Sequence, residues 1–225
     1  MYKRQLEECG DKKAVERDVS PGSKHIGKGI READDDLSKD DRKQFRSIAA
    51  LVLYLAADRP DIQQAVSAIM RGMASPKVLD QLRLRRLAAY LSKYPELTWW
   101  FDYNDNPDHT IYVEVDADWA GQELGRKSCD GGFEFVNGQL IDGWSTVQQT
   151  VALSSGESEL NGICNGAARG LWTKALLTSM QFEFKLRVST DSSAAKGITS
   201  RLGTGRVRHL ETRCLWIQQL SLIHI

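Results

Sequence analysis

Three acidic residues are placed so that their side chains could meet and bind metal ions. Asp116 and Asp191 each follow a short run of alternating apolar and polar residues, a pattern typical of a strand. Glu159 lies in the first turn of a predicted helix, one residue before its apolar stripe begins. If the two strands are neighbours in one sheet and the helix packs across that sheet, the three carboxylates converge.

Converging carboxylates repel one another and need a cation to stay ionised. Oxygen ligands without histidine or cysteine suit Mg²⁺ or Mn²⁺. Two such ions about 4 Å apart are the usual device for phosphodiester chemistry, because one activates a water and the other stabilises the leaving oxygen. The pattern therefore predicts a two-metal site at Asp116, Glu159 and Asp191.

Each acid also has a structural alternative. An acid that ends a strand is commonly a loop residue or a helix cap, as Asp116 would then be. Asp191 is positioned to cap the helix that follows it, and Glu159 would interact favourably with the helix dipole. The neighbouring Glu157 has a structural role of its own, because it stands three residues after Ser154 in a capping box.

Two glycines favour a position of Glu159 against the sheet. Gly162 and Gly166 follow it by three and seven residues and so lie on the same helix face. Glycines on that face let a helix approach a sheet closely. We therefore expect the side chain of Glu159 to contact the sheet instead of water.

The elements that must position the acids surround them in the sequence. Asn137-Gly138 is the strongest short hairpin signal, and the segments on both sides of it have strand composition. Together with the strand that ends at Asp116, they predict an antiparallel three-strand meander. The other expected elements are a strand over 97–101, a helix from 154 with a stripe to 171, a helix over about 171–179, a strand over 185–190 and a helix over 209–220.

The first part of the chain has a different character. Residues 1–37 are highly charged and predict a linker or poorly ordered arm. Residues 38–95 predict a small helical segment of three helices, the first capped by Ser38 with Asp41 and the second capped by Asp58. The basic residues of the third helix suit a nucleic-acid backbone or a solvated helix face equally well: Arg83, Arg85, Arg86 and Lys93.

Bulk properties exclude several classes of protein. The 225 residues carry 30 basic and 30 acidic side chains, so the total charge does not indicate non-specific electrostatic binding of nucleic acid. Four scattered cysteines argue against a zinc site or a disulfide framework. No signal peptide and no membrane-spanning run occur, so we expect an intracellular protein, cytoplasmic or nuclear, without a membrane partner.

The order of these elements resembles the ribonuclease H fold, an α/β fold in which a parallel fourth strand joins the meander. The local sequence motifs resemble more closely still those of the ribonuclease H domain of copia-type LTR retrotransposon Pol polyproteins. Residues 45–48 and 53–62 resemble the segment that follows the polymerase in those polyproteins, and the likeness covers about residues 40–220. The motifs that carry it are Val-Asp-Ala-Asp-Trp-Ala-Gly at 115–121, Arg126-Lys127-Ser128, Val-Ala-Leu-Ser-Ser-Gly-Glu-Ser-Glu at 151–159, Asp191-Ser-Ser-Ala and Arg208-His209-Leu-Glu.

The resemblance implies metal-dependent cutting of the RNA strand of an RNA–DNA hybrid, with the 2′-hydroxyl distinguishing RNA from DNA. It implies Mg²⁺ or Mn²⁺ as the cofactor, two ions in the active state, and Asp116, Glu159 and Asp191 as catalytic metal ligands. Asp118 is an accessory or loop-fixing acid. A glycine-broken basic loop over 201–208 and the helix after it are expected to bind nucleic acid through Arg206, Arg208 and His209. The remainder of a Pol polyprotein, with its polymerase upstream, is the other expected partner.

The chain also departs from the family pattern. The family has a fourth ligand, an aspartate near a last helix that follows a fifth strand, and we expect both elements to be missing from a domain over 96–220 with a tail at 221–225. Glu211 is the accessory candidate for the missing acid. No Tyr-x-Asp-Asp sequence occurs, so no polymerase activity is expected. Whether the chain is an enzyme stays open: an impaired ribonuclease H is one hypothesis, and a decayed, non-catalytic remnant that binds nucleic acid or a protein is the other.

Overall fold

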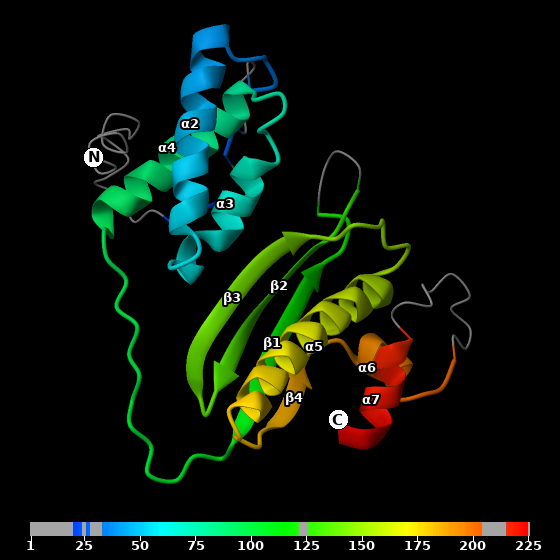
Figure 1. Ribbon diagram of the computed structural model, residues 1–225. Coiled ribbons are helices and arrows are strands. Elements are labelled where there is room, and N and C mark those ends of the chain that lie inside the picture. Colours follow the sequence, from blue (N-terminus) through cyan, green and yellow to red (C-terminus); the bar gives the residue numbers. More distant parts are fainter. Residues whose placement is uncertain (1–19, 24–25, 28–32, 122–125, 204–214, 225) are drawn as a thin grey trace. The chain divides into compact units, whose positions relative to one another are not determined.

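The computed structural model describes residues 20–23, 26–27, 33–121, 126–203 and 215–224. The chain forms two compact units, residues 1–99 and 100–225. Figure 1 shows a helical first unit and a second unit in which helices pack on a sheet. No helix among the described residues combines the length and the apolar character needed to cross a membrane.

The described residues of the first unit form three α-helices around an apolar core. These are α2 (Lys39–Leu55), α3 (Gln63–Met70) and α4 (Val78–Lys93), with a 3-10 turn η1 (Pro60–Ile62) before α3. The expected cap of α2 is confirmed, because Ser38 accepts a hydrogen bond from the Asp41 N–H at 3.2 Å. The core consists of residues that recur at helical spacing: Phe45, Ile48, Val52, Ile62, Val66, Ile69, Leu84 and Leu87.

The sequence pattern predicted that Asp58 caps the second helix, and this prediction is wrong. Arg59 precedes η1 without a side-chain cap. Its guanidinium instead forms a two-pronged ion pair with Asp61, at 2.9 and 2.8 Å, and donates to the carbonyl oxygens of Tyr94 and Pro95. This arginine thereby ties the start of η1 to the end of α4.

Three of the four basic residues on the third helix have partners among the described residues of their own unit. Lys93 lies over the ring of Tyr94, 5.5 Å from its centroid. Arg83 pairs with Asp80 at 3.0 Å, and Arg86 donates to the carbonyl oxygen of Ser20. These contacts satisfy backbone and carboxylate oxygens near the helix, so both arginines already have structural roles.

The second unit is built on a mixed four-strand sheet with the order β3-β2-β1-β4. Strands β1 (Thr110–Asp118), β2 (Cys129–Val136) and β3 (Gln139–Val147) form the predicted antiparallel meander, and β4 (Lys185–Ser189) runs parallel to β1. Asn137 and Gly138 both have positive φ, 52° and 80°, which is the conformation that a two-residue hairpin loop requires.

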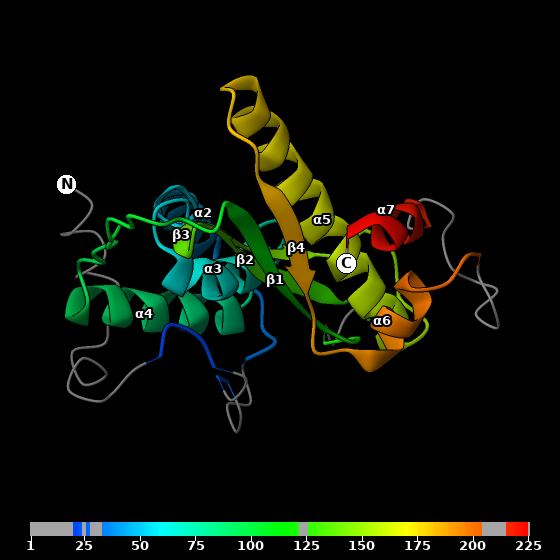
Figure 2. The same ribbon diagram turned by 90° about the horizontal axis from the view of Figure 1, so that it is seen from below.

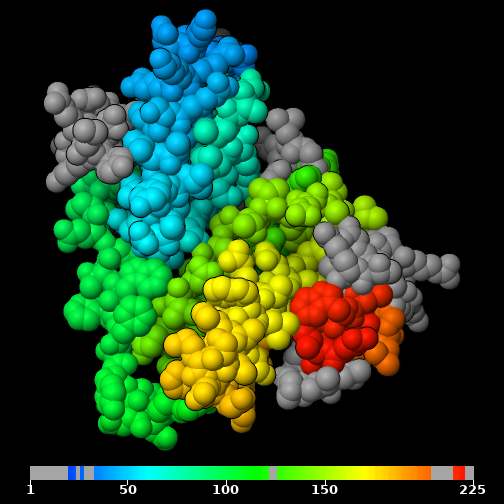
Figure 3. Space-filling view, viewed as in Figure 1, coloured from blue at the N-terminus to red at the C-terminus, as the bar shows by residue number. Residues whose placement is uncertain are grey.

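Three helices lie together on one face of this sheet: α5 (Ser155–Ser179), α6 (Ser193–Thr199) and α7 (Trp216–His224). Figure 2 shows the three on the same side of β1 and β4. Alternate residues of β1, namely Ile111, Val113 and Val115, are buried beneath them. Helix α7 packs on α6 (Figure 3) and adds Ile217 to the same core. The predicted α/β fold class, with a helical segment before a ribonuclease H-like mixed sheet, is confirmed.

Three local predictions differ from the structure. Residues 97–101 form no strand, because they straddle the boundary between the two compact units and pair with none of the four strands. The two helices expected from 154 to 179 are one continuous helix of 25 residues. Helix α7 continues to His224, beyond the end expected at Leu220.

A row of glycines sets the distance between α5 and β1. Gly162, Gly166 and Gly170 recur every fourth residue and all three are buried. A Cβ atom at Gly166 would overlap Cγ1 of Val115 and lie 3.1 Å from Cγ1 of Val113. The helix therefore rests on the strand with no side chain between them.

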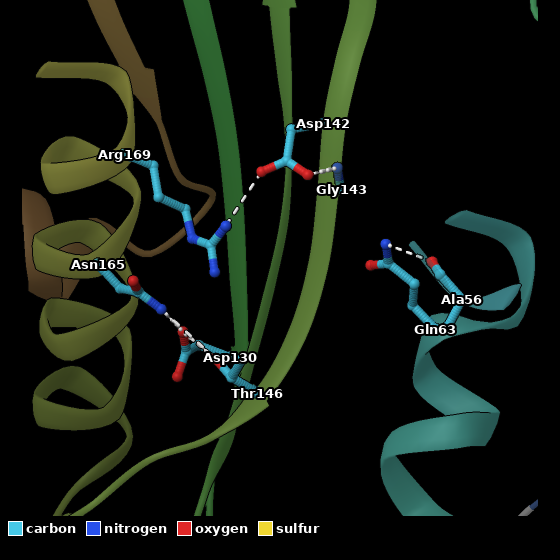
Figure 4. Close-up of polar contacts among 8 residues, drawn as sticks. All are labelled: Ala56, Gln63, Asp130, Asp142, Gly143, Thr146, Asn165 and Arg169. Atoms are coloured by element: carbon cyan, nitrogen blue, oxygen red, sulfur yellow. Dashed lines mark hydrogen bonds and ion pairs between the residues drawn. The ribbon is translucent and has the colours of Figure 1, made fainter. Parts of the chain in front are cut away.

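The flank of α5 that faces β2 and β3 is polar. Asn165 donates to the carboxylate of Asp130, and Arg169 pairs with Asp142 at 3.0 Å (Figure 4). The Arg169 guanidinium also lies 4.6 Å from the ring centroid of Trp144. These contacts fix the rotation of the helix about its own axis.

Glu134 on β2 is buried deep in this polar flank, with 2 % of its surface exposed. The hydroxyl of Thr173 is hydrogen-bonded to the carboxyl, but Oε1 has no partner among the described residues. Burial raises the pKa of Glu134, and the negative charge of Asp142 raises it further, while Thr173 and Arg169 act in the opposite direction.

The close contact between α5 and β1 gives a stability prediction. Gly166→Ala is expected to destabilise the second unit by ~1–3 kcal/mol, because the overlap with Val115 outweighs the better helix propensity of alanine. Gly197→Ala on α6 is the matched control, since a Cβ atom there meets nothing within 4 Å. Urea unfolding of both variants tests this, and an equally stable Gly166→Ala protein would contradict it.

The raised pKa of Glu134 gives a pH prediction. The folded protein holds the Glu134 proton more tightly than the unfolded chain, whose ordinary value is 4.5. The free energy of unfolding contributed by this group is therefore present at low pH and falls as the pH rises from about 4.5 through the raised pKa.

Glu134→Gln should remove this decline, so that the variant loses less stability than the wild type between about pH 5 and pH 8. Thermal melts across that range measure the difference. The exposed Glu114 of β1 offers the control, because Glu114→Gln should follow the wild-type curve. Parallel curves for Glu134→Gln and the wild type would show that burial of this carboxyl has no energetic consequence.

Candidate metal centre

The structure brings the three predicted acids together. Asp116, Glu159 and Asp191 each offer a carboxylate oxygen, and these atoms all lie within 4.8 Å of one another. The carboxylates of Asp116 and Asp191 are exposed, whereas Glu159 is buried and has 7 % of its surface exposed. The cluster is therefore open to solvent on one side and closed by protein on the other.

Parallel pairing of two strands places the two aspartates. The ladder between β1 and β4 ends where Glu114 meets Ser189. Asp116 and Asp191 each follow this last pair by two residues, so they leave the same end of the sheet. The first turns of α5 lie at the end to which the arrow of β1 points (Figure 1), which brings Glu159 to the two aspartates.

The surroundings of Glu159 differ from those of an ordinary helix-end glutamate. Helix α5 begins at Ser155, so Glu159 is its fifth residue and lies beyond the predicted first turn. The dipole effect falls off within the first turn. The helix cap is formed by its neighbours, because Glu157 donates its N–H to Ser154 and accepts the N–H of Leu153 at 2.7 Å.

Asp191 is likewise free of the capping role. Ser192 caps α6 instead, with its hydroxyl accepting the N–H of Ala195 at 3.2 Å. The structural alternatives for Glu159 and Asp191 are thus assigned to the residues beside them.

Glu159 has an incompletely satisfied carboxyl. The N–H of Ala117 and the hydroxyl of Thr190 are hydrogen-bonded to it, but Oε2 has no partner among the described residues. Burial raises the pKa of Glu159, and the charges of Asp116 and Asp191 raise it further, against the two hydrogen bonds. A buried orphan oxygen beside two like charges is the environment that a hard cation would relieve. The three residues therefore fit a magnesium or manganese ion.

Asp118 lies close by but serves the loop. Its carboxylate accepts the N–H of Cys129, and a Cβ atom at Gly121 would overlap that carboxylate. Its backbone oxygen accepts the hydroxyl of Ser158 at 3.1 Å. Of the two roles left open for Asp118, the geometry matches the loop-fixing one.

Buried polar contacts join the loops around the acids. The Ser128 hydroxyl accepts the N–H of Ala120 at 3.1 Å, and its carbonyl oxygen accepts the N–H of Gln148 at 2.8 Å. The Gln148 side chain then donates to the carbonyl oxygen of Ser158, one residue before Glu159. Sequence reasoning missed these supports and the hydrogen bond from Thr190, since single polar residues in loops carry no periodic signal.

The other predicted site residues lie outside the described residues. These are Arg206, Arg208, His209 and Glu211.

Comparison with known proteins finds that the chain is similar to transposon polyproteins and to an uncharacterized mitochondrial protein. It is 32 % identical over 136 residues to the uncharacterized mitochondrial protein AtMg00810 of Arabidopsis thaliana, covering 60 % of this chain and 55 % of that protein. It is 29 % identical over 140 residues to the retrovirus-related Pol polyprotein from transposon RE1 of the same plant, covering 62 % of this chain and 9 % of the polyprotein. The corresponding polyprotein from transposon RE2 is 28 % identical over 150 residues, covering 62 % of this chain and 10 % of the polyprotein.

No family model matches the chain, and no solved structure matches it. The chain spans about half the length of the mitochondrial protein and about a tenth of each polyprotein. The resemblance to Pol polyproteins found in the motifs is confirmed by these matches. The chain is accordingly a homologue of a segment of the retrovirus-related Pol polyproteins of copia-type transposons.

Proposed function

We propose that the second unit is a metal-dependent ribonuclease H-type nuclease that hydrolyses the RNA strand of RNA–DNA hybrids. The convergence of Asp116, Glu159 and Asp191 carries the proposal. The kinship with Pol polyproteins supports the choice of substrate, because the motifs around these acids resemble the ribonuclease H part of such polyproteins.

The three carboxylates would hold one or two magnesium or manganese ions. When bound, such ions activate a water and stabilise the negative charge of the phosphodiester during its hydrolysis. Asp116 and Asp191 present exposed carboxylates to the side from which a substrate arrives. Glu159 closes the opposite side, and its hydrogen bonds with Ala117 and Thr190 hold it in place.

The choice between RNA and DNA requires contact with the 2′-hydroxyl of the strand that is cut. We propose that the loops joined through Ser128 and Gln148 keep the acids at a constant distance from the RNA strand that is cut. We expect weak activity, since the resemblance implies a fourth carboxylate and the described residues bring three acids together.

Metal binding gives the first test of the site. Mg²⁺ or Mn²⁺ should raise the melting temperature of the wild-type protein, because the ion neutralises three acids that repel one another. Glu159→Gln should abolish most of this rise. Glu157→Gln is the matched control: it lies one half-turn away on the same helix, is equally buried and keeps its cap acceptor oxygen. Equal shifts in the two variants would remove Glu159 from the site.

Cleavage of a labelled RNA–DNA hybrid gives the second test. The wild-type chain should cut the RNA strand in Mn²⁺. Asp116→Asn should lower the rate by at least about a hundredfold, because the site loses a charged metal ligand. At 1.4 kcal/mol for each factor of ten, this corresponds to about 2.8 kcal/mol of transition-state stabilisation. Glu157→Gln should retain the activity.

The remnant hypothesis makes the opposite forecast. A folded wild-type chain that binds the hybrid but does not cut it, in either metal, would favour a non-catalytic remnant. Cutting that survives Asp116→Asn would reject the assignment of the site instead.

A further inference from the structure

An exposed apolar patch lies beside the acid cluster. Trp119 has 53 % of its surface exposed, and Val151 and Leu153 have 45 % and 64 % exposed. The indole N–H of Trp119 donates to the carbonyl oxygen of Ala152 at 3.1 Å, between those two residues. The hydrogen bond fixes the ring while its surface stays accessible to solvent, an arrangement suited to contact with a flat partner.

The two segments that form the patch are also those that carry two of the acids. Trp119 follows Asp116 by three residues at the end of β1. The loop containing Val151 and Leu153 leads into α5, where the N–H of Leu153 is hydrogen-bonded to Glu157, two residues before Glu159. The patch and the acids therefore lie at the same end of the sheet.

Two basic residues stand at the same end. Arg126 and Lys127 come directly before β2, whose first residue, Cys129, pairs with Asp118 of β1. Ser128, which follows them, is fully buried and bonded to Ala120, so their distance from Trp119 is set by the fold. Neither has an ion pair with a described residue. Two such cations have the charge to bind one phosphodiester of a nucleic-acid strand while the next phosphodiester of that strand lies at the three acids.

We propose that Trp119, Arg126 and Lys127 form a nucleic-acid-binding shelf next to the acid cluster. The indole packs against a sugar ring of the bound strand, and the two cations bind its phosphates. This inference deepens the proposed function and rests on it for the identity of the strand. The combination of an accessible aromatic ring with cations is the one that binds nucleic-acid backbones without reading their sequence.

The shelf can be tested by binding, without any cleavage. In an Asp116→Asn background, the anisotropy of a fluorescein-labelled RNA–DNA hybrid reports its dissociation constant. Trp119→Ala should raise that constant by about 2- to 10-fold, because the bound strand loses its packing contact with the ring. Trp119→Phe keeps an aromatic ring and should stay within about twofold of the parent.

Trp172 supplies the matched control for the ring. It is 69 % exposed on α5, thirteen residues and so about 20 Å along the helix from Glu159. Trp172→Ala should leave the dissociation constant unchanged.

The cations are tested by the salt dependence of the same constant. Changing both Arg126 and Lys127 to alanine should lower the slope of log Kd against log salt by about 2, close to one for each lost phosphate contact. Changing both Lys185 and Arg187 to alanine removes the same charge at the other end of the sheet, where Lys185 pairs with Thr110, and should leave the slope unchanged.

The outcomes separate the shelf from the proposed activity. Shelf variants that bind the hybrid as tightly as their controls overturn the shelf, whether or not the wild type cuts. Weaker binding by the shelf variants, with no cutting by the wild type, supports the shelf and rejects the nuclease. A wild-type chain that binds no nucleic acid overturns the shelf. The exposed apolar patch is then interpreted as a surface for a protein partner. If Trp119→Ala fails to fold, the salt slope of the alanine pair decides alone.

Discussion

The contact between the glycine face of α5 and strand β1 is the constraint on which the second unit depends. A Cβ atom at Gly166 or Gly170 would overlap side chains of the sheet, so the helix axis lies closer to the sheet than larger residues at these positions would permit. At this distance the N–H of Ala117, on the strand, is hydrogen-bonded to the carboxyl of Glu159, on the helix. Residues without side chains thus help to set the position of one acid of the cluster.

The polar flank of the same helix completes the placement. Glycines define how close α5 comes but not how it is rotated, since a smooth surface permits turning. Asn165 with Asp130 and Arg169 with Asp142 hold the helix at one angle. Glu134 and its orphan oxygen are the energetic disadvantage of this flank, because a polar layer under a helix can leave one member unsatisfied. Apolar packing would stabilise the interface more but would specify the angle less.

Sequence reasoning succeeded where chemistry depends on short-range spacing. The hairpin at Asn137-Gly138, the cap at Ser154 and the glycines that follow Glu159 all act within a few residues, and the structure has each of them. It failed where the outcome depends on a distant neighbour. Residues 97–101 have strand composition, yet they straddle the boundary between the two compact units and pair with no strand of the sheet. The burial of Glu134 could not be predicted either, since the alternation of apolar and polar residues in β2 does not reveal which face of the strand α5 covers.

Within the candidate site, the prediction of the acids and the prediction of their roles rest on different grounds. The convergence of Asp116, Glu159 and Asp191 followed from two strand ends and a helix start, a topological argument that the sheet order bears out. Their proposed roles are those that the resemblance implies, and elimination of the structural alternatives supports them. Ser192 takes the cap of α6, Glu157 the cap of α5 and Asp118 the loop. Three carboxylates within 4.8 Å of one another repel, and a cation would relieve that repulsion. This electrostatic cost is the physical argument behind the proposal that the site binds a metal.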